Sequence, residues 1–126
     1  MTIHPSALML AMTTEADEVR AETLALRLLE DRLVACVSLA PIRSLYLWRE
    51  AVQKDTEIQL LLKTTSEHLE ALHRAVIKFH SYDTPEWLVW PAEASQAYGS
   101  WALEVLRTDA SRPAPAETPG SAPPAG

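Results

Sequence analysis

Residues 57–64 read Glu57-Ile58-Gln59-Leu60-Leu61-Leu62-Lys63-Thr64, and their alternation predicts a β-strand. Apolar and polar side chains alternate along these residues, as they do on a strand that buries one face. Leu61 is the exception, because it places an apolar side chain on the polar face. The predicted buried face consists of Ile58, Leu60 and Leu62.

Before this strand, the continuous apolar run 7–12 predicts a central strand. Thr14 stands three residues before Asp17, which approximates a capping box and predicts a helix reaching about Arg32. The apolar stripe expected on that helix is Val19, Leu26, Leu29 and Leu33, widened by Leu24, Ala25 and Leu28.

A second apolar run, 33–39, also predicts a strand, and Pro41 after it indicates a bulge or an edge position. The strand pattern resumes at residues 44–48. The polar stretch 49–56 contains the expected turn into the strand at 57–64. These segments together predict a long hairpin.

After residue 64, Thr65 or Ser66 is expected to cap a second helix. A polar corner at residues 80–86 separates this helix from a strand at 87–90, which Pro91 is expected to stop. A last helix covers roughly residues 95–107. The stripe of the second helix is Leu69, Leu72, Val76 and Phe79.

The order β-α-β-β-α-β plus a final helix predicts an α+β fold, a ferredoxin-like sandwich with an extra C-terminal helix. Both main helices would cover one face of the sheet and leave much of the other uncovered. Tyr46 and Trp48 would overhang the core at the end of the long hairpin. An uncovered face and an aromatic overhang favour self-association.

The chain has 126 residues and 48% hydrophobic residues, which fits one globular domain at 1–108. The tail 109–126 is rich in proline and alanine and is predicted to be disordered and solvated, with a polyproline II ligand as the alternative. The start of the chain has no signal peptide pattern and no membrane-spanning stretch, so the predicted location is cytoplasmic and no membrane partner is expected.

Composition also excludes several classes of function. A net charge of −6 argues against a nucleic-acid partner. The single cysteine, Cys36, rules out an internal disulfide and a multi-cysteine zinc site. Three glycines leave no phosphate-binding loop, and no nucleophile motif is present, so the chain is not expected to be an enzyme.

Five ordered motifs give the chain a resemblance to a known family. They are Arg32–Ser38, Ser44–Trp48, Glu57–Thr64, His80-Ser81-Tyr82-Asp83-Thr84-Pro85-Glu86 and Tyr98–Trp101. Their spacing resembles that of the CutA divalent-cation tolerance family across nearly all of residues 7–107. The resemblance implies a compact homotrimer, with copper and other divalent cations as ligands and no obligatory cofactor. It also leaves an alternative, a signalling trimer of the PII kind that binds a small metabolite in clefts between subunits.

Two positions depart from the family pattern. Ser81 stands where the family usually has proline, and we expect it to loosen the turn that aims its neighbours. Arg49-Glu50-Ala51 stands where the family usually has a hairpin glycine, which should alter the type of turn.

The candidate metal ligands are Cys36, His80, Asp83 and Glu86. Each has a structural alternative. Cys36 is a soft ligand for copper but also a small residue for core packing. His80 either closes a helix or acts as a ligand or base. Asp83 and Glu86 offer oxygen ligands, whereas Glu86 could instead accept backbone bonds.

A second predicted set lines the cleft between subunits: Trp48, Glu57, Lys63 and Tyr82. Lys63 is either a solvated surface lysine or the charge partner of Glu86 or of an anionic ligand. Trp48 is first an interface aromatic, with ligand stacking as the minority interpretation.

Overall fold

A computed structural model describes residues 8–107 and contains a four-stranded sheet with three helices. The strands are β1 (Leu8–Glu15), β2 (Cys36–Trp48), β3 (Ala51–Thr65) and β4 (Leu88–Ala92). The helices are α1 (Glu18–Glu30), α2 (Leu69–Phe79) and α3 (Gln96–Val105). This is the predicted element order, and the predicted α+β fold is confirmed. The predicted tail at 109–126 lies outside the described residues.

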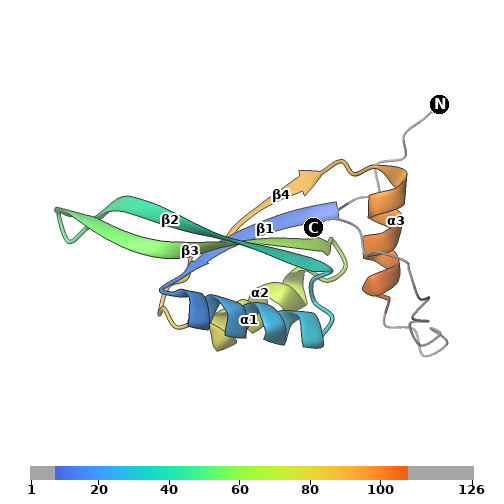
Figure 1. Cartoon of the computed structure of the whole chain (residues 1–126), viewed down its shortest axis with the longest axis horizontal. Helices are drawn as coiled ribbons and strands as arrows, with labels where there is room; N and C mark the ends of the chain where they lie inside the picture. Colours follow the sequence, from blue (N-terminus) through green and yellow to red (C-terminus); the bar gives the residue numbers. More distant parts are fainter. Residues whose placement is uncertain (1–7, 108–126) are drawn as a thin grey trace.

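The sheet is antiparallel in the order β2-β3-β1-β4 (Figure 1). β3 pairs with β2 on one side and β1 on the other, so it lies inside the sheet, and β2 and β4 form the edges. α1 and α2 cover one face (Figure 1). Their contact buries Leu60 and Leu62 of β3 completely, together with Leu28, Leu72 and Val76 from the helices. The predicted buried face of β3 is therefore confirmed, and that of α2 is confirmed at Leu72 and Val76, whereas Leu69 and Phe79 are only partly buried.

We call the other side of the sheet the open face. α3 packs on its end, where Leu8 and Ala35 meet Ala102 and Leu106 in a second small core. The strand register places Leu10, Met12, Leu61, Leu88 and Trp90 side by side on the rest of this face. Of these, Leu88 is 52% exposed and Trp90 is 36% exposed. An apolar row of this kind on an exposed sheet indicates a contact surface.

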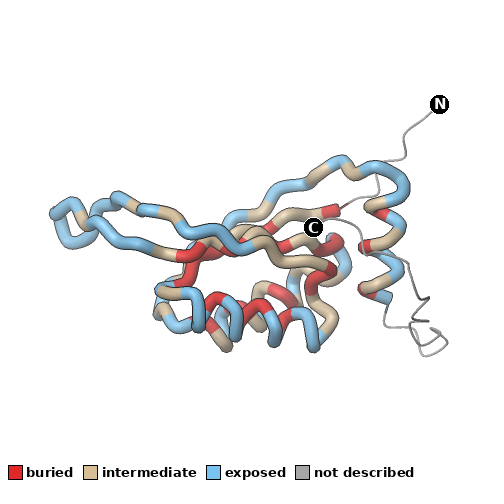
Figure 2. Tube along the Cα trace, in the orientation of Figure 1, coloured by how far each residue is buried: buried red, intermediate tan, exposed pale blue. Residues whose placement is uncertain are grey.

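The β2–β3 hairpin extends far beyond the helices, and its outer half is exposed (Figure 2). Pairing runs without a bulge from Cys36 opposite Lys63 to Trp48 opposite Ala51. Pro41 fits this regular ladder because β2 is an edge strand, so the edge alternative is the right one. A two-residue turn at Arg49 and Glu50 closes the hairpin with φ values of 50° and 64°. Both values are positive, as in a type I′ turn, although neither residue is glycine.

Several predicted boundaries differ from the structure. β1 continues to Glu15, so Thr14 pairs with β3, and the side chain of Asp17 caps α1 by accepting from Arg20 N–H at 2.8 Å. α2 begins later than expected, with His68 as its N-cap instead of Thr65 or Ser66. β4 runs through Pro91 because an edge strand does not need every N–H for pairing.

The predicted buried stripe of α1 was right only in part, because Leu24, Ala25 and Leu28 are buried as expected and Val19, Leu26 and Leu29 are not. The buried residues are Ala21, Leu24, Ala25 and Leu28, whereas Val19 is 76% exposed and Leu26 is 50% exposed. Leucine and alanine almost encircle this helix, so periodicity alone did not select the side that meets the sheet. None of the helices in the described range 8–107 is long and apolar enough to cross a membrane.

The two sides of α1 should respond differently to mutation. We expect Leu28→Ala to lower the free energy of unfolding by about 3 kcal/mol, because it removes a fully buried side chain and leaves a cavity. Val19→Ala should change it by no more than about 0.5 kcal/mol. Urea denaturation at one protein concentration measures both. Equal losses would show that the assignment of the buried side is incorrect.

Candidate functional site

The corner that joins α2 to β4 is tied to the end of β1. The N–H of His80 donates to Val76 O at 2.9 Å and ends α2. The imidazole then reaches across to β1, where Nε2 lies 2.6 Å from Thr14 O. Its other nitrogen, Nδ1, accepts the N–H of Tyr82 at 2.9 Å. A carbonyl can only accept and an amide N–H can only donate, so His80 is the neutral tautomer with the proton on Nε2.

A buried carboxylate completes this corner. The Glu15 side chain is 2% exposed and the His80 side chain is 0% exposed, with 3.6 Å between Glu15 Oε2 and His80 Nδ1. Ser81 donates twice to Glu15, from its backbone N–H at 3.0 Å and from its hydroxyl. Ala16 N–H adds a third donor at 3.1 Å. These three bonds offset the loss of water around the carboxylate.

Ser81 therefore fastens the corner, contrary to the expectation that it would loosen the turn. Proline at this position would have neither the N–H nor the hydroxyl that Glu15 accepts. Neither Glu15 nor this pairing was expected from the sequence. A hint was present, since an acidic residue follows Thr13 and Thr14 at the end of an otherwise apolar strand.

Tyr82 extends from this corner to the open face. Its ring lies against the His80 ring with the centroids 4.9 Å apart, and its hydroxyl donates to Glu57 Oε1 at 2.9 Å. Burial and the hydrogen bond to Glu57 raise the pKa of Tyr82, so the phenol stays protonated as a donor. Glu57 and Tyr82, both predicted to line a cleft between subunits, thus meet within one chain.

Glu86 lies close enough to Glu57 for the two carboxylates to interact. Partial burial and the charge of Glu57 both raise the pKa of Glu86. Asp55 continues the group along β3 and accepts a hydrogen bond from the Tyr46 hydroxyl. We call Asp55, Glu57 and Glu86 the acidic patch. Its two phenols, Tyr46 and Tyr82, each donate to one of its carboxylates.

A separate polar group lies at the other end of β3, near α3. Lys63 Nζ is 3.6 Å from Cys36 Sγ and 3.1 Å from Ser38 Oγ. The Tyr98 ring also approaches Cys36, and burial together with that thiol raises the pKa of Tyr98. Lys63 lies six residue steps along β3 from Glu57, or about 20 Å at 3.3 Å per residue. Lys63 is therefore beside Cys36 and distant from the acidic patch of its own chain.

The predicted metal ligands do not converge within one chain. Cys36 lies beside Lys63, and Glu86 lies beside Glu57. Both nitrogens of His80 are already bonded to backbone groups. Asp83 is exposed in the corner. Across residues 8–107, no three His, Cys, Asp or Glu side chains are placed to hold a metal together. A site that combines all four residues stays a prediction and would need groups from more than one chain.

The predicted cleft residues fall at three places on the hairpin. Trp48 is exposed near the tip, with the Arg49 guanidinium 5.6 Å from its ring centroid. Glu57 and Tyr82 meet in the middle, and Lys63 lies at the base. A cleft that uses all of them would also need a second subunit.

Comparison with known proteins agrees with this architecture. Residues 9–105 match the family model described as CutA1 divalent ion tolerance protein. The chain belongs to the CutA1 family. A relative named divalent-cation tolerance protein CutA, from Pectobacterium atrosepticum, is 41% identical over 98 residues, covering 76% of this chain and 89% of the relative. An Escherichia coli CutA is 38% identical over 104 residues, covering 81% and 93%.

Solved CutA structures share the fold. CutA from Synechococcus elongatus superposes with a TM-score of 0.79 at 41% identity, covering 81% of this chain and 92% of that one. The divalent cation tolerance protein from Thermus thermophilus gives 0.72 at 36% identity, covering 75% and 94%. The match to the CutA1 model ends at residue 105, so the proline-rich tail lies beyond it.

The role of Ser81 can be tested by a double-mutant cycle. Ser81→Pro removes two donors from a buried carboxylate and should cost about 3 kcal/mol of unfolding free energy, whereas Ser81→Ala removes the hydroxyl alone and should cost about 1 kcal/mol. In a Glu15→Ala background the cost of Ser81→Pro should fall by at least half. An unchanged cost there would mean that proline acts through the backbone and not through Glu15.

Proposed function

We propose that this CutA1-family chain contributes to divalent-cation tolerance as a homotrimer that binds divalent ions at the acidic patch, where ligands from a neighbouring subunit would complete a site that residues 8–107 of one chain do not form alone. The main observation that supports this proposal is the interaction between the carboxylates of Glu57 and Glu86. Partial burial, and after it the negative charge of Glu57, raises the pKa of Glu86, so a second negative charge is disfavoured there. A divalent cation would supply the missing positive charge, and carboxylate oxygens are suitable ligands.

The surroundings of the patch also support cation binding. The hydroxyl of Tyr82 fixes one oxygen of Glu57 and leaves the other oxygen for a ligand. The backbone bonds of His80 hold Tyr82 from behind, so His80 would act here by positioning and not by ligation. Copper, the expected metal, has a second candidate ligand in the soft thiol of Cys36.

The open face and the hairpin support a trimer. Leu88 and Trp90 expose apolar surface beside Leu10 and Met12, and the hairpin projects the largely exposed Trp48 beyond the core. Such surfaces gain free energy when another copy covers them. The assembly could then join the acidic patch of one chain to polar groups of its neighbour.

We also propose that the chain acts by binding and not by catalysis. A histidine base needs a free nitrogen that can accept a proton, and the Nδ1 of His80 already accepts the Tyr82 N–H. The Ser81 hydroxyl donates to Glu15 and is not activated by an imidazole. The PII-like metabolite alternative and a cytoplasmic location stay predictions.

Calorimetric titration of metal-free protein with Cu²⁺ tests the site. Glu57→Gln and Glu86→Gln should each weaken binding at least about tenfold, or about 1.4 kcal/mol. Glu70→Gln, on the exposed side of α2, is the matched control and should bind as the unmodified protein does. Affinity should fall as the pH drops toward 5, because protons compete for a Glu86 whose pKa is raised.

The same titration distinguishes the alternatives. Normal binding by both glutamine variants, with loss in Cys36→Ala, would place the metal at the thiol instead of the acidic patch. Normal binding by all three variants would contradict both assignments.

Sedimentation velocity at micromolar concentration tests the assembly. We expect a species of three times the 14.0 kDa chain mass. Leu88→Glu on the open face should dissociate it, whereas Leu26→Glu on the helix layer should not. The two leucines are matched, at 52% and 50% exposed. A monomeric unmodified protein, or equal effects of the two variants, would contradict the proposed contact surface.

A further inference from the structure

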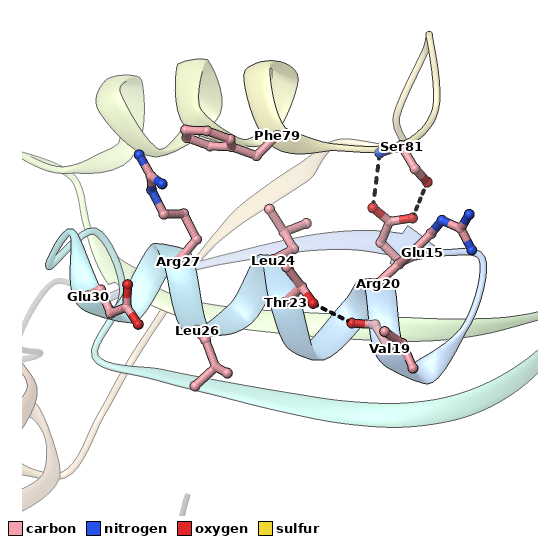
Figure 3. A pocket seen from close by; sticks show the side chains of 10 residues that line it. All are labelled: Glu15, Val19, Arg20, Thr23, Leu24, Leu26, Arg27, Glu30, Phe79 and Ser81. Carbon is pink, nitrogen blue, oxygen red and sulfur yellow. Dashed lines mark hydrogen bonds between the residues drawn. The ribbon is translucent and has the colours of Figure 1, made fainter.

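A groove runs along α1 beside α2, on the helix layer of the molecule (Figure 3). Its volume is about 490 Å³. Val19, Leu24, Leu26 and Phe79 supply its apolar surface, and Arg20 and Arg27 line it with positive charge. Val19 and Leu26 are the exposed residues that helical periodicity had predicted to be buried. An apolar groove that stays open to solvent indicates a binding surface.

This groove lies on the side of the sheet opposite the open face. α1 and α2 pack against the face that contains Leu60 and Leu62, whereas Leu88 and Trp90 belong to the other face. A trimer formed through the open face and the hairpin would therefore leave the groove uncovered. Its occupant must come from elsewhere.

The C-terminal segment starts beside one end of the groove. Arg32, just after α1, donates from Nη1 to Val105 O at 3.0 Å and so fastens the end of α3 to the end of α1. Glu30, two residues before Arg32, lines the groove. Residues 108–126 follow directly, and a polyproline II chain of that length reaches about 59 Å at 3.1 Å per residue. α1 is only about 20 Å long, so this segment is long enough to run along the whole groove.

The segment and the groove are also chemically matched. Pro113, Pro115, Pro119, Pro123 and Pro124 favour polyproline II, which docks in grooves with aromatic walls. The Phe79 ring supplies such a wall, and the Arg27 guanidinium lies 4.2 Å from its centroid.

Charge supports the match only locally. The groove is lined by Arg20 and Arg27 but also by Glu15 and Glu30, and residues 113–124 contain one acid, Glu117, which the two arginines could attract. Arg20 pairs with Asp17 and Arg27 pairs with Asp31, and all four side chains are exposed. Exposed ion pairs are weak, so each arginine can also interact with a second carboxylate.

We propose that residues 113–124 of the chain bind in the groove between α1 and α2 as a polyproline II segment of the same chain. The short connection from Val105 raises the effective concentration of the segment to the millimolar range, so a weak contact is enough. The match to the CutA1 family model ends at residue 105, so residues 113–124 lie outside the shared domain. Binding of these residues in the groove would therefore be a property of this chain and not of the shared domain. The segment would shield Val19, Leu26 and Phe79 from other partners.

Nuclear magnetic resonance of ¹⁵N-labelled protein tests the proposal. The full chain is compared with a variant that ends after Arg107. We expect the amide signals of Val19, Leu26 and Phe79 to differ between the two. Addition of a synthetic peptide of residues 108–126 to the shortened chain should move these signals toward their positions in the full chain. Leu26→Lys in the full chain should remove the difference, whereas Leu103→Lys, an exposed leucine on α3, should retain it.

Each other outcome overturns the proposal. Superimposable groove signals in the full and shortened chains would show that the groove is not occupied by the segment. Signals that depend on protein concentration would assign the contact to the segment of another molecule. Equal effects of Leu26→Lys and Leu103→Lys would place the contact outside the groove.

Discussion

The alternation of side chains along β3 is the constraint on which the other elements depend. Leu60 and Leu62 point into the core under α1 and α2 and are fully buried there. A strand cannot send neighbouring side chains to the same side, so Glu57, Leu61 and Lys63 must face the other way. The alternation of side chains along β3 therefore determines the face on which the helices pack. It also places the acidic patch and the Cys36–Lys63 group on the open face. Both candidate ligand groups thus lie on the surface that a neighbouring subunit would approach.

The corner after α2 converts this arrangement into a rigid site. His80 takes one bond from Tyr82 and gives one to Thr14, so α2, β1 and the acidic patch are held in a fixed relation. Buried hydrogen-bonded groups of this kind are costly when one partner is lost, and they therefore define one geometry. His80, one of the four predicted metal ligands, uses both ring nitrogens on backbone groups and supports the tyrosine that donates to Glu57.

Local patterns predicted the fold well, because the order of elements and the buried faces of β3 and α2 depend on periodicity alone. α1 was predicted in the right place but with too wide a buried stripe. Leu24, Ala25 and Leu28 are buried as expected, whereas Val19 and Leu26 are exposed, because apolar residues surround the helix too evenly for periodicity to exclude them. The site was harder. Tyr82 and Glu57 were both assigned to a cleft between subunits, and their direct hydrogen bond within one chain was not expected. The bonds of His80 to Thr14 and of Ser81 to Glu15 each span 66 residues of sequence. No spacing rule detects such contacts before the chain is folded.

The pairing of Ser81 with Glu15 has a consequence for how this sequence can change over time. A serine that satisfies a buried carboxylate is dispensable only after that carboxylate is gone. In this chain a change from Ser81 to proline should therefore cost less once residue 15 has become uncharged than while Glu15 is present. The two positions therefore constrain each other's substitutions, although 66 residues separate them in sequence.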